Sequence, residues 1–396
     1  MKQEDSALDR GLTWDSRYDD LGDHVVLTFR LETGADRKDT AYLFARILST
    51  SCAVRLCEET DEIRRRRGAK VVEVDDKCVV LAFPVANITG QIVDLLLASY
   101  VDLNTEIYAV LELEDLVLPS TLISAFERAP FGRRLLTSYG RPRRPLVIGV
   151  VKPSQGLAPS AHVELAVEAF RGGCDVVKDD ENLLPADLEN PLPERVSRLA
   201  PRIRTLREKL QRPLMYVVNI HSDVDAERYC RYLDEAGSAL PPLFGALVSP
   251  MLGLPYLRLL RRATSVPLFC HSTGIGLFVS GAFRISRRAY IKLLRLTGID
   301  ALIHAPPFAN GWQCSPELAA QLRTWCAEPM HDLPEILLTF GGGLGPTNYK
   351  HIRRILGTSE FGYLVGGSIF AHPRGPAAGA KSLNEAIDEA ESRNYQ

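Results

Sequence analysis

The strongest local signal for chemistry in this sequence is the run KDDEN, Lys178 to Asn182, which follows a short apolar segment. Strand alternation would place Lys178 and Asp180 on one face, and Glu181 would turn toward the same face as the strand ends. Mg²⁺ prefers oxygen ligands in an octahedral site and usually keeps several waters. The run could therefore hold Mg²⁺, or alternatively it is a solvated acidic strand end that caps the next helix.

An ammonium group cannot ligate a metal, so Lys178 has two interpretations. It either balances the charge of the two carboxylates, or it reacts with CO₂ and becomes a carbamate, which would be a third anionic oxygen ligand. Carbamylation needs a deprotonated amine, and both burial and a nearby cation favour that form.

Other polar residues also stand where apolar runs end: Lys152, Asn219, His221, His271 and His304. Each of them could be an ordinary hydrogen-bonded rim residue, but all follow segments that have the composition of strands. In a parallel barrel the carboxyl ends of the strands converge on one mouth, where active sites are built. The joint pattern predicts a catalytic mouth.

Two glycine clusters follow later strand candidates, TFGGGLGP with Gly342 and Gly343, and VGGSIF with Gly366 and Gly367. Glycine lets backbone N–H groups approach phosphate oxygens, and barrels commonly bind phosphate in this region. The alternative is a pair of tight turns at the barrel rim.

The elements that must position these residues recur with a regular spacing after Pro145. Eight apolar runs alternate with amphipathic segments, and eight such units in about 250 residues match a (β/α)₈ TIM barrel. An open doubly wound sheet is the competitor, but KPSQGL after the first run is a poor dinucleotide fingerprint. The strand candidates are 146–153, 174–181, 214–220, 244–250, 267–272, 299–305, 335–340 and 361–367.

The first part of the chain mixes strand and helix patterns, as in a ferredoxin-like α+β domain. We predict a flexible tail over 1–22, an α+β N-terminal domain over 23–142 that ends with a helix from Pro119 to about Arg128, and a catalytic barrel over 143–396. The basic segment Gly132–Pro145 is interpreted as the linker.

Composition excludes several classes of protein. The 396 residues carry 47 Lys and Arg against 49 Asp and Glu, a net charge of −2, so neither disorder nor nucleic-acid binding is expected. No apolar run approaches the roughly 18 residues of a membrane span, and the polar N-terminus does not resemble a signal peptide. We expect a cytoplasmic protein whose eight scattered cysteines are free thiols.

Taken together, VKPSQGL, GGCDVVKDDEN, FCHSTG, LIHAPPF and VGGSIFAHPRG resemble the large-chain family of ribulose-bisphosphate carboxylase, over nearly the whole chain. The resemblance implies an α+β domain followed by a barrel, assembled as a homodimer or a larger oligomer of dimers. It implies that Lys178 carries a CO₂-derived carbamate and binds Mg²⁺ with Asp180 and Glu181. It also implies catalytic roles for Lys152, His271 and His304, a substrate contact for Asn219, and phosphate binding by Gly342, Gly343, Gly366 and Gly367.

The departures from that family point in one direction. Ser154 replaces a second lysine, Ser272 a phosphate-binding arginine, and Gly341 a serine, while HAPPFANGW (304–312) lacks the lysine that orients CO₂. Asn104 is the candidate for the asparagine that completes a partner's site. Pro306, Pro307, Phe308 and Trp312 form either an apolar lid or a loop packed on the barrel.

The retained and missing groups predict a RuBisCO-like enzyme that enolises a singly phosphorylated ketose or oxo-sugar without fixing CO₂, as an isomerase or enolase. A decarboxylase of a phosphorylated 3-oxo sugar acid uses the same enolate and is the first alternative. A non-catalytic sugar-phosphate binder is the second.

Overall fold

The computed structural model describes residues 22–50, 56–100, 108–308 and 314–392. The predicted tail, except for residue 22, and the candidates Asn104 and Trp312 lie outside the described residues. The chain divides into two compact units, 1–127 with 275–296, and 128–274 with 297–396. The sequence predicts a boundary at residue 142, whereas the first compact unit ends at residue 127 and also includes residues 275–296.

The N-terminal unit contains a five-stranded sheet in the order β10-β4-β1-β3-β2. The four strands nearest the N-terminus pair antiparallel in the order expected of a ferredoxin-like βαββαβ domain, which confirms that prediction. The fifth strand, β10, comes from beyond residue 274 and pairs parallel with β4, from Phe283↔Leu111 to Ile285↔Leu113. This pairing explains why 275–296 joins the first unit. The strands are β1 (His24–Thr33), β2 (Lys70–Val74), β3 (Cys78–Pro84), β4 (Tyr108–Val117) and β10 (Phe283–Ile285).

Helices of the N-terminal unit begin where the sequence supplies caps. The Asp36 side chain accepts from the backbone N–H of Asp39 at the start of α2, and Thr60 does the same for Ile63 in α3. The predicted helix from Pro119 to Arg128 is wrong in length, because α5 ends at Ile123. The helical segments are α2 (Arg37–Ile47), α3 (Asp61–Arg67), η3 (Val85–Asn87), α4 (Ile92–Tyr100), α5 (Ser120–Ile123), α11 (Gly276–Val279) and α12 (Arg287–Leu296).

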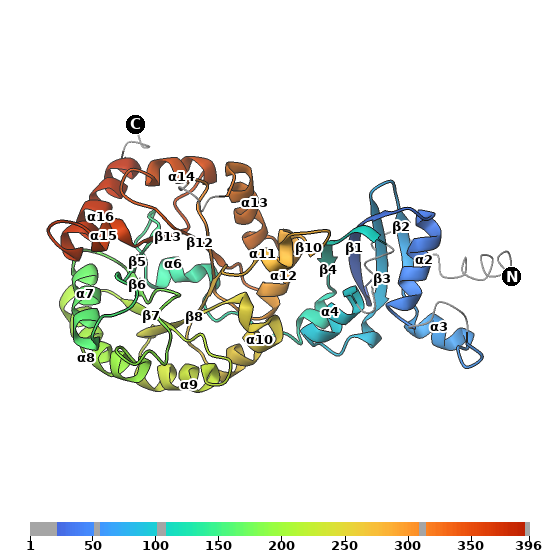
Figure 1. The fold of residues 1–396 in the computed structure, drawn as a ribbon, viewed down its shortest axis with the longest axis horizontal. Helices are drawn as coiled ribbons and strands as arrows, with labels where there is room; N and C mark the ends of the chain where they lie inside the picture. Colours follow the sequence, from blue (N-terminus) through green and yellow to red (C-terminus); the bar gives the residue numbers. More distant parts are fainter. Residues whose placement is uncertain (1–21, 51–55, 101–107, 309–313, 393–396) are drawn as a thin grey trace. The chain divides into compact units, whose positions relative to one another are not determined.

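The second unit is a closed barrel of eight parallel strands, as predicted, in the order β11-β12-β13-β5-β6-β7-β8-β9 (Figure 1). Its strands are nearly all buried on both faces, which matches their continuous apolar composition. Each of the eight predicted runs coincides with one strand, and only β12 extends beyond its run, by one residue. The strands are β5 (Leu146–Val150), β6 (Val176–Lys178), β7 (Met215–Asn219), β8 (Phe244–Val248), β9 (Leu268–His271), β11 (Ala301–His304), β12 (Leu337–Gly341) and β13 (Gly362–Val365).

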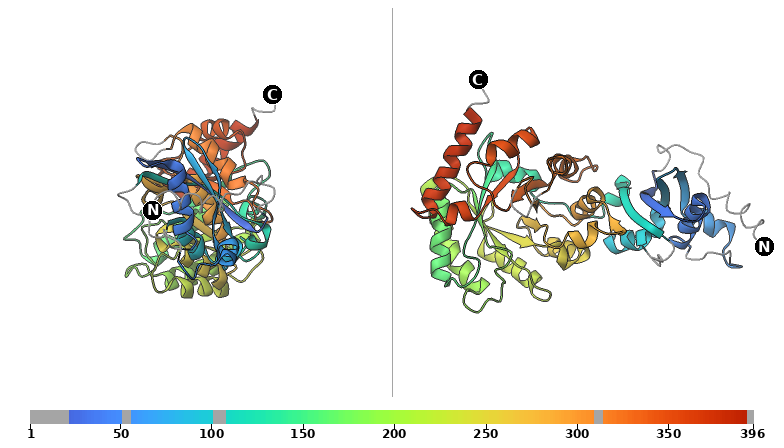
Figure 2. Two further views of the ribbon diagram at one scale, coloured as in Figure 1. Left: turned by 90° about the vertical axis from the view of Figure 1, so that its right-hand side faces the viewer. Right: turned by 45° about the horizontal axis from the view of Figure 1, so that its top comes forward.

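Helices form the outer layer of the barrel (Figure 1), and the C-terminal helix α16 packs against α7 on the outside (Figure 2). Several begin with proline in the first turn, where its missing N–H is not needed. The helical segments are η4 (Gly132–Arg134), α6 (Leu135–Ser138), α7 (Pro159–Arg171), α8 (Leu192–Leu210), α9 (Ala226–Ala236), η5 (Pro250–Leu252), α10 (Leu254–Ala263), α13 (Pro316–Ala327), α14 (Tyr349–Leu356), α15 (Gly367–Phe370) and α16 (Pro376–Ser392).

Alternate strand residues fill the barrel interior, and α6 closes one end of it. Met215 and Val217 of β7 belong to the same buried cluster as Leu135 and Tyr139. The Tyr139 hydroxyl donates to the carbonyl of Pro242 at 2.8 Å. The prediction of a linker over 132–145 is therefore wrong, because two large apolar side chains of this segment are part of the barrel core.

Among the described residues, no helix has both the length and the apolar character needed to cross a membrane.

Candidate active site

The predicted site residues of the first two barrel strands meet at the C-terminal end of the barrel. Lys152, two residues beyond β5, forms an ion pair with Asp180, and its Nζ lies 3.4 Å from the Ser154 hydroxyl. Lys178, the last residue of β6, places Nζ 3.3 Å from Glu181 Oε2. The mouth therefore holds two lysine–carboxylate pairs.

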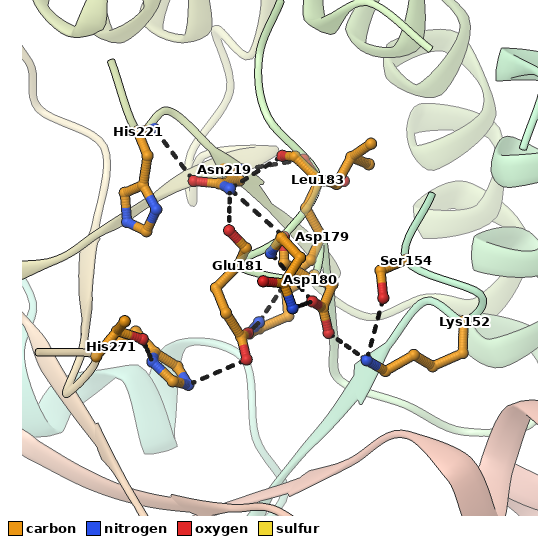
Figure 3. Close-up of polar contacts among 12 residues, drawn as sticks. Lys152, Ser154, Asp179, Asp180, Glu181, Leu183, Asn219, His221 and His271 are labelled. Carbon is orange, nitrogen blue, oxygen red and sulfur yellow. Dashed lines mark hydrogen bonds and ion pairs between the residues drawn. The ribbon is translucent and has the colours of Figure 1, made fainter. Parts of the chain in front are cut away.

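On the other side of Glu181 stands the imidazole of β9. His271 Nε2 lies 3.7 Å from Glu181 Oε1, while Lys152 approaches Asp180 from the opposite side (Figure 3). The second ring nitrogen, Nδ1, is 2.6 Å from the Thr273 hydroxyl. Sequence reasoning missed Thr273, although its position two residues after His271 in HST was the available signal.

Burial controls the protonation of this cluster. Lys178 is 1% exposed, and removal from water lowers the pKa of its amine despite the neighbouring carboxylates. Burial likewise lowers the pKa of His271 to about 4, so the ring is neutral at pH 7. Burial opposes ionisation of Asp180, but hydrogen bonds from Lys152 and Asn182 outweigh it and leave that pKa below its ordinary value.

His304 ends β11, the strand beside β9, as predicted. Ile303 pairs with His271, so His304 lies one residue beyond that pair. Its Nδ1 is 3.1 Å from the carbonyl oxygen of Ala305, and the side chain is buried. The structure thus places His304 on the same rim as His271.

Asn219 occupies the end of β7, but its amide is used within the protein. Nδ2 donates to the carbonyls of Glu181 at 3.0 Å and Leu183 at 2.9 Å, and Oδ1 accepts the N–H of His221 at 3.1 Å. The side chain is 0% exposed. The resemblance predicts a substrate contact for Asn219; in this structure its amide bonds the loop that carries Asp180 and Glu181.

The glycine clusters form two loops at the same rim. Gly342 and Gly343 have φ of +115° and +65°, values that L side chains rarely adopt. A Cβ on Gly366 would lie 3.5 Å from Lys152 Cε, so the loop after β13 borders Lys152. Gly342, Gly343 and Gly367 are exposed. Of the two loops, the one after β13 is therefore the one that borders Lys152.

The donor set fits Mg²⁺ when Lys178 carries CO₂. In the described part of the chain, no three Asp, Glu, His or Cys side chains are grouped so that they could hold a metal ion. Asp180 and Glu181 supply two carboxylates, and a carbamate on Lys178 would supply the third anionic ligand. A buried amine with a lowered pKa is the form that reacts with CO₂.

Comparison with known proteins identifies the family of the chain. Residues 130–394 match the family described as ribulose bisphosphate carboxylase large chain, catalytic domain. The chain is 30% identical to ribulose bisphosphate carboxylase-like protein 2 of Rhodopseudomonas palustris, over 93% of this chain and 90% of that one. It is 27% identical to 3-oxo-isoapionate-4-phosphate decarboxylase of Rhizobium etli, over 92% and 93%.

Among solved structures, the octameric ribulose-1,5-bisphosphate carboxylase/oxygenase of Pyrococcus horikoshii superimposes with a TM-score of 0.83, at 22% identity, over 96% of this chain and 90% of that one. This likeness establishes the shared fold. With the family match and the relative that is 30% identical, it leads to one conclusion: the chain is a RuBisCO-like member of the ribulose bisphosphate carboxylase large-chain family.

Proposed function

We propose that the protein is a Mg²⁺-dependent enzyme that enolises a singly phosphorylated ketose or oxo-sugar, as an isomerase or enolase, without net CO₂ fixation. The observation that carries this proposal is the meeting of Lys152, Lys178, Asp180, Glu181 and His271 at the barrel mouth. Carboxylates for a cation and an amine for proton transfer are the groups that enolisation requires.

Lys178, as a carbamate, would hold Mg²⁺ together with Asp180 and Glu181. When bound, the cation polarises a substrate carbonyl and makes the neighbouring C–H more acidic, an effect worth several kcal/mol. Asn219 keeps the backbone of Glu181 in place.

The proton is moved by this chain's own amine. Lys152 is 41% exposed at its side chain, so a substrate can reach its Nζ, which is now paired with Asp180. With Asp180 holding the cation, Lys152 would be released from this ion pair and would be the base that takes the proton from carbon. The Lys178 carbamate is the other candidate base. Neutral His271 and the nearby His304 are positioned as hydrogen-bonding groups for substrate oxygens.

One phosphate fits the remaining polar groups. The N–H groups of Gly342, Gly343, Gly366 and Gly367 would receive it, and the loop after β13 borders Lys152, so the phosphate and the base lie close together. Ser272 stands where the carboxylases have the arginine that binds a second phosphate group. The absence of lysine from residues 304–312 removes the group that orients CO₂.

Decarboxylation of a phosphorylated 3-oxo sugar acid is the second candidate, favoured by the similarity to the Rhizobium enzyme named for that reaction. Loss of CO₂ from a 3-oxo acid produces the same enolate, which Lys152 as the ammonium form would protonate. We further propose a homodimer or a larger homo-oligomer, in keeping with the octameric neighbour of the same fold.

The test uses the protein incubated with bicarbonate and Mg²⁺, then a panel of phosphorylated ketoses and 3-oxo sugar acids in D₂O. Exchange of the α-proton is followed by NMR and CO₂ release by a coupled assay. Exchange without CO₂ release supports the first proposal, and CO₂ release supports the second. Tight binding of a sugar phosphate with neither signal would instead identify a non-catalytic binder. A Lys152→Ala protein that exchanges at the wild-type rate would exclude Lys152 as the base.

A further inference from the structure

Asp179 stands between the proposed ligands Lys178 and Asp180, yet its side chain faces the other way. Val176 belongs to the buried cluster inside the barrel, so alternation places Lys178 on the same face and turns Asp179 outward, toward the helices. The side chain is 0% exposed. The proposed reaction uses its two neighbours and leaves this buried carboxylate without a role.

Three hydrogen-bond donors and the His162 imidazole, from three elements, surround the Asp179 carboxylate. Arg195 Nη2 of α8 lies 2.8 Å from Oδ2, and the backbone N–H of Asn219 donates to the same oxygen at 2.9 Å. The Tyr216 hydroxyl donates to Oδ1 at 2.5 Å, and His162 Nε2 of α7 is 3.3 Å from Oδ1. These contacts hold the pKa of Asp179 far below its ordinary value despite full burial.

The outer members of this cluster are themselves fixed. Asn190 Nδ2 lies 3.2 Å from His162 Nδ1, and an amide donor there leaves the ring proton on Nε2, which faces Tyr216 at 2.6 Å. Arg195 also donates to the carbonyl of Asn190. The carboxylate is therefore held in one orientation from α7, α8 and β7 together.

A continuous chain of hydrogen bonds runs from this cluster to the barrel mouth. Asp179 binds the backbone N–H of Asn219, and the Asn219 amide binds the carbonyls of Glu181 and Leu183 (Figure 3). The N–H of Asp179 also continues the ladder to β7 through the carbonyl of Val217 at 2.9 Å. Since β6 ends at Lys178, these bonds contribute to the path of the loop that follows it.

We propose that Asp179 is a positioning residue, which holds Asp180 and Glu181 in the geometry that receives the cation by fastening their loop to β7, α7 and α8. The cation-binding part of this inference rests on the proposed function, whereas the ordering of the loop does not. Outer partners of metal ligands typically change metal affinity by about 10–100-fold when they are removed.

A matched control exists at the other end of the same strand. Asp175 is also a 0% exposed carboxylate, accepts the backbone N–H of Val147 at 3.0 Å, and pairs with Arg212 at 2.8 Å. Asp175→Asn and Asp179→Asn therefore remove the same kind of buried charge. Only the second removes it beside the mouth.

The first measurement is hydrogen–deuterium exchange on the metal-free protein. Asp179→Asn should speed exchange in the peptide that covers residues 180–183 and at Asn219 by at least about tenfold, while Asp175→Asn leaves that peptide at the wild-type rate. Unchanged exchange in Asp179→Asn, or an equal increase in both variants, would overturn the positioning role. Because no metal is present, this result stands apart from the fate of the proposed function.

The second measurement is Mn²⁺ affinity in the presence of bicarbonate, by electron paramagnetic resonance, with the carbamate trapped chemically and located by mass spectrometry. Asp179→Asn should weaken Mn²⁺ binding about 10–100-fold and Asp175→Asn should not. Tyr216→Phe keeps the charge pair with Arg195 and should weaken binding less than about tenfold, which supplies a test if Asp179→Asn fails to fold. Wild-type affinity in Asp179→Asn, or in Tyr216→Phe where Asp179→Asn does not fold, would overturn the proposal. A wild-type protein that binds neither CO₂ nor Mn²⁺ would refute the proposed function, and the exchange measurement would then decide the positioning role alone.

Discussion

The two ends of the barrel hold buried carboxylates with different partners. At the N-terminal end, Asp300 accepts the backbone N–H groups of Phe131, Gly132 and Leu268, each at 2.8 Å, and pairs with Arg261. At the C-terminal mouth, Asp180 and Glu181 face lysines and a histidine.

This difference in partners indicates that the carboxylate at the N-terminal end stabilises the fold and that those at the C-terminal mouth are suited to chemistry. Arginine is always charged and matches a carboxylate with its planar fork, so the pairs at the closed end are permanent. Lysine and histidine change protonation when buried, and lysine also reacts as an amine. A fixed charge at the N-terminal end and a variable charge at the C-terminal end agree with the general pattern in these barrels, where the first end serves stability and the second serves catalysis.

The largest effect is expected at the mouth, from Lys178→Met. This substitution removes the only described route to a third anionic ligand, so α-proton exchange should fall by at least about a thousandfold, which corresponds to several kcal/mol of lost stabilisation. Folding should persist, because an apolar chain replaces a buried amine. Exchange rate and thermal midpoint are the measurements, and retained exchange would show that the carbamate is not needed.

At the closed end, Asp300→Ala should have the opposite outcome. It leaves Arg261 buried without its partner, so the free energy of unfolding should fall by about 3–5 kcal/mol. The folded fraction should keep wild-type Mn²⁺ affinity. Asp332→Ala, which breaks an exposed pair with Arg128, should cost less than about 1 kcal/mol in the same urea titration. Equal losses in the two variants would contradict the comparison.

Leu135→Ala tests whether the segment before β5 belongs to the barrel. Removal of this fully buried side chain should lower the free energy of unfolding by about 2–4 kcal/mol, with no change in cation affinity. A neutral result in chemical denaturation would restore the interpretation of the segment as a linker.

The smallest effects separate two glycines with positive φ. Gly342→Ala strains a loop at the mouth, where φ is +115°, and should raise KM for the phosphorylated substrate several-fold. Gly357→Ala introduces strain at the end of α14, where φ is +67°. It should lower the free energy of unfolding by about 1–3 kcal/mol and leave KM unchanged. A rise in KM for both variants would show that strain, and not phosphate contact, is responsible.

Some features of the fold follow from local sequence pattern. The eight barrel strands were predictable because each is a short apolar run closed by polar or glycine residues, and KDDEN marked the mouth because Lys178 ends such a run. Other features depend on distant pairing. β10 joins a strand about 170 residues earlier in the chain, and no local signal at Phe283–Ile285 indicates that partner.

The sequence by itself determined the class of both units, the eight barrel strands and the residues that reach the mouth, since alternation and turn residues act over a few positions. Only the tertiary structure decided which way the polar residues of that mouth are used. Asn219 bonds the loop after β6, and Asp179 faces outward. Their partners come from other strands and helices, up to about 40 residues away. Burial then lowered the pKa of Lys178 and of His271, because desolvation depends on everything packed around them.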